Sequence, residues 1–232
     1  MTQRANNPIP RKNQSLSRPV SQHGFSLIEL LVTMFIVSLL LAIGGPQFSQ
    51  FLSNNRMAAS INELNISLHV ARTEAIKRNS FVSLCPSSNW DDPNPTCDAV
   101  GDFSEGWIVF IDADFDGAPD LTVDNSDNVL QAHPPIYEGM DLTAGTRDAV
   151  LASSQFISYA PSGRPLEEIA GNPAVFNIQL CDHRGSIDTG SGIAAGRWIN
   201  ISPTGRPQMH RSTDALGHAN NILGGCSYMS GG

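Results

Sequence analysis

The sequence is poor in charged residues and contains none of the common catalytic signatures. Asp, Glu, Lys and Arg make up 16% of its 232 residues, and hydrophobic residues make up 41%. This composition permits a packed core and argues against wholesale disorder. The chain has no G-x-S-x-G elbow, phosphate-binding loop, H-E-x-x-H helix or dinucleotide-binding fingerprint. These absences favour a structural or binding protein over an enzyme, and the length suits one domain with appendages or two small domains.

Basic residues are scarce after the N-terminal segment. Residues 1–24 hold four basic residues and no acid, whereas the rest of the chain holds 10 basic and 22 acidic residues, a net charge of −12. Such an acidic body repels polyanions on average. Any contact with nucleic acid therefore has to be a small local patch.

Cysteine is limited to four residues, Cys85, Cys97, Cys181 and Cys226, with no C-x-x-C spacing. An even count behind an export-type N-terminus indicates an oxidising compartment and disulfide bonds. Of the three pairings that four cysteines allow, the nearest-neighbour one joins Cys85 to Cys97 and Cys181 to Cys226. Its two loops contribute about 3 and about 4 kcal/mol in the chain-entropy model. The alternative, a zinc site without supporting spacing, would use Cys181, His183, His218 and Cys226.

One long apolar run, Phe25 to Ile43, dominates the N-terminal part of the chain. It is interrupted only by three hydroxyl residues and one acid, Glu29. As a helix it is about 28 Å long, enough to cross a bilayer core. A secretory signal cut after Gly44 and an ordinary membrane anchor both fit this length. Both leave Glu29 in hydrocarbon without a reason, at a cost of about 2.5–3.5 kcal/mol.

Cleavage between Gly24 and Phe25 would explain the acid. It frees an α-amino group four residues before Glu29, and the amine of a neighbouring copy can pair with that carboxylate. Residues 24–29, G-F-S-L-I-E, resemble the prepilin-peptidase site of type IV pilins and type II secretion pseudopilins. The resemblance implies a leader at 1–24 that prepilin peptidase removes, N-methylation of Phe25, and a transmembrane helix over 25–45.

The chain after the membrane segment is expected to continue as a helix with a break. The Gly-Gly-Pro sequence ending at Pro46 predicts an interruption, because proline removes a donor and kinks or locally melts a helix. The resemblance implies that the helix partly melts there during fibre assembly. Apolar residues from Met57 to Ala75 recur at intervals of three and four, which predicts an amphipathic helix over 46–79. The cations off this stripe, Arg72 among them, are expected to form an ordinary solvated face.

Strand patterns dominate residues 80–232. Six short segments are bounded by Gly, Pro, Asp or Asn, at 81–85, 106–112, 128–133, 155–160, 174–181 and 196–202. Alternation of apolar and polar residues in 174–181 predicts one buried face. A long helix followed by antiparallel strands predicts an α+β domain. The two S/T-G-R-P sequences, 162–165 and 204–207, predict turns between strands.

Three segments of this domain resemble motifs of the GspH/FimT branch of pilins and pseudopilins. They are A-R-T-E-A-I-K-R (71–78), G-W-I-V-F-I-D (106–112) and S-P-T-G-R (202–206), and the resemblance covers nearly the whole chain. It implies a pilin-like fold, in which a long N-terminal helix with a transmembrane first half packs on an antiparallel β domain. It also implies a single-pass protein of the bacterial inner membrane, with its globular domain in the periplasm, that assembles with other minor and major pilins or pseudopilins. The branch includes minor pilins of type IV pili and a minor pseudopilin of the type II secretion system, which the motifs do not separate.

A D-x-D-x-D-G motif is a candidate calcium site. It consists of Asp112, Asp114 and Asp116 before Gly117, with Asp120 close behind. Alternating carboxylates with a glycine at the turn can converge on a hard cation. The twelfth position, which is Glu in an EF-hand, is Val here, so a polar hairpin turn is the alternative.

The segment T-G-R-P-Q-M-H-R, 204–211, is a candidate DNA contact. Competence-associated members of the branch bind DNA near a G-R-x-R motif, and here Gln208 replaces the second Arg. Arg206 and Arg211 would grip phosphates in an accessory role during DNA uptake. From residue 80 onward, however, the chain has 6 basic and 19 acidic residues, and no Phe, Tyr or Trp is interleaved in 204–211 to stack bases. A turn that ends a strand is the alternative.

The sequence therefore predicts a non-enzymatic minor pilin that primes or caps a type IV pilus. The pilus system is favoured because the 204–211 segment resembles the competence-type members. The first alternative is the equivalent minor pseudopilin of type II secretion. A hypothesis of another class is an exported soluble domain, cut after Gly44, that binds calcium or acts as an adhesin.

Overall fold

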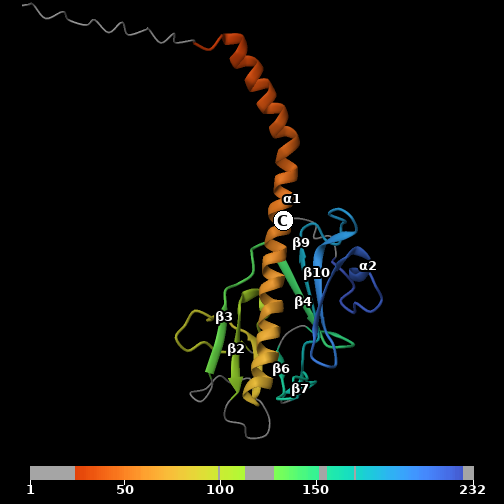
Figure 1. Ribbon diagram of the computed structural model, residues 1–232. Coiled ribbons are helices and arrows are strands. Elements are labelled where there is room, and N and C mark those ends of the chain that lie inside the picture. The colour runs from red at the N-terminus through yellow and green to blue at the C-terminus, as the bar shows by residue number, and fades with distance from the viewer. Residues whose placement is uncertain (1–23, 99, 113–127, 152–155, 170, 227–232) are drawn as a thin grey trace, which may run out of the picture. The chain divides into compact units, whose positions relative to one another are not determined.

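The computed structural model describes residues 24–98, 100–112, 128–151, 156–169 and 171–226 (Figure 1). The chain divides into two compact units, Met1–Phe48 and Ser49–Gly232. The first unit contains the beginning of helix α1 (Leu27–Arg78), and the second contains the remainder of that helix and all of the described strands.

Within the second unit, α1 is amphipathic and buries a single stripe. The buried apolar residues are Met57, Ile61, Leu64, Leu68, Ala71 and Ala75. Their spacing of three and four residues places them on one side of the helix, as the sequence predicts. Figure 1 shows this half of α1 between two groups of strands, with β2 and β3 to one side of it and β4, β9 and β10 to the other.

A four-stranded antiparallel sheet has the order β3-β2-β1-β6. Its strands are β1 (Phe81–Pro86), β2 (Trp107–Asp112), β3 (Asn128–His133) and β6 (Ile157–Tyr159). Each coincides with a predicted strand to within three residues. A 3₁₀ turn, η1 (Phe103–Glu105), precedes β2 and buries Phe103.

A five-stranded antiparallel sheet has the order β11-β10-β9-β4-β5. Its strands are β4 (Met140–Gly145), β5 (Val150–Leu151), β9 (Asn177–Asp182), β10 (Ile193–Ile201) and β11 (Pro207–Ser212). A small pair, β7 (Glu168–Ile169) with β8 (Asn172–Pro173), and a short helix, α2 (Thr213–Leu216), complete the described elements. The α+β class with an antiparallel β domain is thus confirmed.

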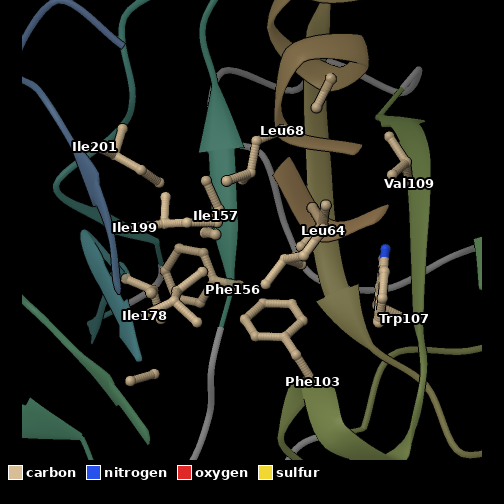
Figure 2. Close-up of a cluster of buried hydrophobic side chains, with 14 of the residues drawn as sticks. Leu64, Leu68, Phe103, Trp107, Val109, Phe156, Ile157, Ile178, Ile199 and Ile201 are labelled. Carbon is tan, nitrogen blue, oxygen red and sulfur yellow. The ribbon is translucent and has the colours of Figure 1, made fainter. Parts of the chain in front are cut away.

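The main core lies where α1 meets both sheets. Figure 2 shows Leu64 and Leu68 of α1 among Val109 of β2, Ile157 of β6 and Ile178 of β9. Burying an aliphatic side chain of this size stabilises the fold by about 1.5–3 kcal/mol. This shared core binds the helix and the two sheets of the second unit into one folding unit.

The prediction that β9 buries only one face is wrong, because all six of its residues are buried. The polar side chains of its second face are hydrogen-bonded. Asn177 donates from Nδ2 to the Thr146 carbonyl at 2.6 Å, and Gln179 accepts at Oε1 from Asn221 Nδ2 at 2.7 Å. The connection between β4 and β5 and the C-terminal segment thus satisfy one buried amide each on this face.

The structure contains the nearest-neighbour disulfides. The first disulfide joins Cys85 to Cys97 across 12 residues, and the C-terminal disulfide joins Cys181 of β9 to Cys226 across 45 residues. Both sulfurs of the proposed zinc site are therefore used in the C-terminal disulfide, so that alternative is wrong. This bond fastens the end of the described chain to the second face of β9.

Candidate assembly site

The predicted cleavage site lies at the exposed start of α1. Gly24, Phe25 and Ser26 precede the helix, and the Phe25 side chain is 83% exposed. The first hydrogen bond of the helix runs from the Leu30 amide to the Ser26 carbonyl at 3.1 Å. The Gly24–Phe25 peptide bond is therefore outside the helical hydrogen-bond ladder, in a position that a peptidase can reach.

Glu29 lies in the first turn of α1 and is exposed. A carboxylate near a helix N-terminus is stabilised by the positive end of the helix dipole. Among the described residues, no hydrogen bond or ion pair engages its side chain. Its two carboxylate oxygens are available to a group from outside this chain.

The first unit of the chain presents its apolar side chains outward. Large apolar residues from Phe25 to Phe48 are 49–83% exposed, and α1 alone among the described helices is long and apolar enough to cross a bilayer. The two internal hydroxyls bond to their own helix, Thr33 Oγ1 to the Leu30 carbonyl at 2.9 Å and Ser38 Oγ to the Phe35 carbonyl at 2.8 Å. Such intrahelical bonds suit a hydroxyl to a lipid or protein environment, whereas the Glu29 carboxylate has no bond of this kind among the described residues.

The predicted interruption at Pro46 is absent, since α1 is helical through Gly44, Gly45 and Pro46. Proline removes one amide donor, whose partner would be the Ala42 carbonyl, and the turns on both sides keep their own hydrogen bonds. A single missing bond weakens the helix at this point without ending it. Melting during assembly stays a prediction.

The prediction that Arg72 lies on a solvated face is wrong. Its side chain instead bridges two turns of the β domain. Its Nε donates to the Gly163 carbonyl at 3.0 Å, and its Nη2 donates to the Thr204 carbonyl at 3.3 Å. Gly163 and Thr204 belong to the two S/T-G-R-P turns, whose position between strands is as predicted. At Gly205, where φ is +80°, an added Cβ would collide with the Gly163 carbonyl oxygen, so the turns pack directly on each other.

The neighbouring charges of the same helical motif form a local ion-pair group. Lys77 lies 3.0 Å from Glu74, and Arg78 also donates to that carboxylate. Hydrogen bonds from Arg78 and Lys77 lower the pKa of Glu74. This group lies on the exposed side of α1, and it matches the solvated face that the sequence predicts.

The G-W motif at the start of β2 joins the first sheet to α1. Trp107 donates from Nε1 to Ser67 Oγ of α1 at 3.0 Å, and its ring stacks on His133 of β3 at 4.9 Å. Burial lowers the pKa of His133. Gly106 has φ +110°, and a Cβ there would lie 2.8 Å from the His133 carbonyl oxygen, so only glycine fits.

The candidate calcium site falls mostly outside the described residues. Asp112 ends β2 and is buried, whereas Asp114, Asp116 and Asp120 are not described. No group of three metal-ligating side chains occurs in the described part of the chain. Calcium binding stays a prediction that calorimetry with calcium and with EGTA would test.

The two candidate DNA contacts belong to the β10–β11 hairpin, and both are exposed. Arg206 lies in the turn, whose Gly205 amide donates to the Ser202 carbonyl at 2.8 Å, and Arg211 is in β11. Residues 207–212 form the edge strand β11. The alternative prediction for 204–211, a turn that ends a strand, is therefore correct only for the first part of that segment. A strand that starts with proline is tolerated at a sheet edge.

Comparison with known proteins places this geometry in a family. The family model described as type II transport protein GspH matches residues 60–219, and the model of the prokaryotic N-terminal methylation motif matches residues 20–45. No curated protein matches the chain significantly.

Solved structures with some similarity include two crystal forms of the type IV minor pilin FimU of Pseudomonas aeruginosa. They are 16% and 17% identical, with TM-scores of 0.44 and 0.42, and the matches cover 70% and 67% of this chain and 94% of each FimU chain. The minor pseudopilin EPSH from the type II secretion system of Vibrio cholerae is 11% identical, with a TM-score of 0.40 over 68% of this chain and 96% of that one. Because the GspH model spans most of the sequence, including Arg72, Trp107 and both turns, this chain belongs to the GspH family and carries the N-terminal methylation motif of pilins and pseudopilins.

Proposed function

We propose that this protein is a non-enzymatic minor pilin, similar to FimT and FimU, that primes or caps a type IV pilus. Prepilin peptidase cleaves it after Gly24, and Phe25 is then N-methylated. Before it joins the fibre, the protein is anchored in the inner membrane with its second unit in the periplasm. The observation that carries this proposal is the methylation motif at the start of α1, whose exposed apolar first part holds a single acid, Glu29, without a partner among the described residues.

The proposed assembly step follows from the cost of isolated charge in an apolar environment. Glu29 on its own costs about 2.5–3.5 kcal/mol at the centre of a membrane helix, and an unpaired amine costs a similar amount. When the methylated amine of Phe25 from one subunit meets Glu29 of another, both penalties fall together. The pairing also fixes the axial register between the two helices. The weakened hydrogen bonding at Pro46 lets the helix melt locally as it packs.

The alternative is a minor pseudopilin of the type II secretion system, and the match to the GspH family model is compatible with both roles. Both roles use the same processing and the same charge pair, so the N-terminal helix does not discriminate between them. Deletion of the gene in the native host does. Loss of surface pili with normal protein secretion supports the pilus role, whereas retained exoprotein with normal pili supports the secretion role.

Accessory DNA binding is a second candidate, supported by the exposure of Arg206 and Arg211 on one hairpin. Two cations give a weak and strongly salt-dependent contact, and the acidic domain opposes it. A gel shift with duplex DNA at low and physiological salt tests it. Binding that is lost in Arg206→Ala and Arg211→Ala supports the role, and the absence of a shift at low salt removes it.

Mass spectrometry of the N-terminal peptide tests the processing step directly. The protein is purified from membranes of the native host, with and without its prepilin peptidase. We expect a mature chain that begins at N-methylated Phe25 in the first case and an intact leader in the second. A chain that begins at Gly45 would mean a secretory signal and would overturn the proposal.

A further inference from the structure

A polar pocket of about 380 Å³ opens on the second face of the five-stranded sheet, beside α2 (Figure 1 shows α2 next to β10). None of its lining residues belongs to α1. The lining residues are Trp198, Asn200, Gln208, His210, Ala215, His218 and Asn220. The volume is within the range of pockets that hold small molecules.

Strand register builds the floor of the pocket from two adjacent cross-strand pairs. Trp198 of β10 lies opposite His210 of β11, and Asn200 lies opposite Gln208. Residues opposite each other in an antiparallel pair point to the same face. The indole and imidazole stack with centroids 4.5 Å apart, so an aromatic row and an amide row lie next to each other.

Buried hydrogen bonds fix the floor in place. Asn177 Oδ1 accepts from Trp198 Nε1 at 3.1 Å and from Asn200 Nδ2 at 2.8 Å, and the Asn177 amide is itself held by the Thr146 carbonyl. Because Asn177 is 2% exposed, it serves as a rigid support beneath the pocket. With the Nδ2 of Asn200 directed to Asn177, its Oδ1 is left to accept a hydrogen bond from a ligand.

The wall of the pocket is anchored as firmly. Asn221 donates from Nδ2 to Gln179 of β9 and to the Leu216 carbonyl, at 2.7 and 2.9 Å, and this fixes the loop after α2. Within that loop, the backbone N–H of Asn220 donates to His218 Nδ1 at 3.2 Å. The Nε2 of His218 then carries the hydrogen and serves as a donor. Such pre-organisation limits the entropy lost when a ligand binds.

The chemistry of the lining points to an uncharged ligand with many hydroxyl groups. No Asp, Glu, Lys or Arg side chain lines the pocket, and burial lowers the pKa of His210, which keeps that imidazole neutral near pH 7. Three carboxamides offer paired donors and acceptors, which suit adjacent hydroxyls or an N-acetyl group. Trp198 is only 5% exposed and lies against His210, so the apolar surface offered to the C–H face of a ring is mainly that of the His210 imidazole.

We propose that this pocket binds an uncharged saccharide. Nucleic acid is the less favoured occupant, because neither Arg206 nor Arg211 lines the pocket and a phosphate chain needs cations. Carboxamides next to an aromatic row could accept a sugar from a cell-surface glycan or from the cell-wall polymer, and the two sources share this chemistry. The inference does not depend on the proposed role in fibre assembly.

Saturation-transfer NMR with the full-length chain in a detergent without a sugar head group tests the inference. The probes are triacetylchitotriose, which carries N-acetyl groups, and maltotriose, which carries only hydroxyls. Gln208→Ala and Asn220→Ala each remove an exposed lining amide, and Asn62→Ala on the exposed side of α1 is the matched control. We expect at least one trisaccharide to bind, about fivefold more weakly to each pocket variant and unchanged to the control.

Three outcomes would overturn the inference. One is that neither trisaccharide binds at millimolar concentration. Another is that binding is the same in both pocket variants as in the unmodified chain. The third is that a single-stranded oligonucleotide displaces the sugar and that Arg206→Ala abolishes this displacement, which would make the pocket part of a nucleic-acid site. Circular dichroism of each variant checks that its fold is retained.

Discussion

Replacement of Arg72 by alanine should destabilise the β domain, although this side chain is only half-buried. The change removes two charge-assisted hydrogen bonds, to the carbonyls of Gly163 and Thr204. A hydrogen bond to a charged group contributes about 1.5–3 kcal/mol, and the second bond is long at 3.3 Å. The Gly163 carbonyl also loses a partner in a buried position. We therefore expect a loss of about 2–3 kcal/mol, which corresponds to about 5–10 °C in Tm for a domain of this size.

Thermal unfolding of the full chain in detergent micelles, followed by circular dichroism, measures this effect. Arg206→Ala is the matched control, because its guanidinium makes no hydrogen bond or ion pair within the described residues, and it should change stability by less than about 0.5 kcal/mol. Arg72→Lys should give an intermediate loss, since one ammonium group cannot reach both carbonyls in the geometry of a guanidinium. If Arg72→Ala unfolds at the same temperature as Arg206→Ala, the bridge between the two turns has no energetic role.

Two further predictions concern the second unit. Replacing both cysteines of the C-terminal disulfide by serine should lower the free energy of unfolding by about 4 kcal/mol, and the same change in the first disulfide should lower it by about 3 kcal/mol, because the C-terminal disulfide closes the longer loop. Urea unfolding without reductant ranks the two variants, and a reversed order would contradict the loop argument. Burial lowers the pKa of both His133 and His210 in the folded chain, whereas an exposed histidine in the unfolded chain has a pKa of about 6.5. As the pH falls below that value, the unfolded chain therefore binds more protons than the folded chain. Stability should therefore fall as the pH is lowered from 7 towards 5.5, and a His133→Gln/His210→Gln double variant should flatten this dependence; an unchanged slope would show that other groups cause it.

The sequence was most informative where local chemistry decides the structure. The alternation and boundary residues of 81–85 and 128–133 predict β1 and β3 to within one residue, because both strands are framed by turn formers. The spacing from Met57 to Ala75 predicts the buried side of α1, since helix periodicity is a local property. Strand β4, with the sequence M-D-L-T-A-G, has few β-branched residues, and pairing with β9 makes it a strand.

Features that depend on distant parts of the chain could not be predicted. Arg72 resembles any surface cation in sequence, and its partners lie 91 and 132 residues further along the chain. The burial of Asn177 and Gln179 likewise depends on distant partners, the Thr146 carbonyl and the Asn221 side chain, so the alternating pattern wrongly predicts a strand with one exposed face. The one feature of the sequence that sets Arg72 apart from other surface cations is its place in the A-R-T-E-A-I-K-R motif, residues 71–78.

The central claim is that Glu29 pairs with the freed amine of a neighbouring subunit, and incorporation into the fibre tests it most directly. Glu29→Ala and Glu29→Gln are expressed in the native host next to Glu63→Ala, which removes an exposed acid further along the same helix. Immunoblots compare the amount of each protein in the inner membrane with the amount in sheared fibres, and N-terminal analysis checks cleavage after Gly24. The account predicts that both Glu29 variants are inserted and cleaved normally but are missing from the fibre, whereas Glu63→Ala is incorporated normally. Normal incorporation of Glu29→Ala would contradict it.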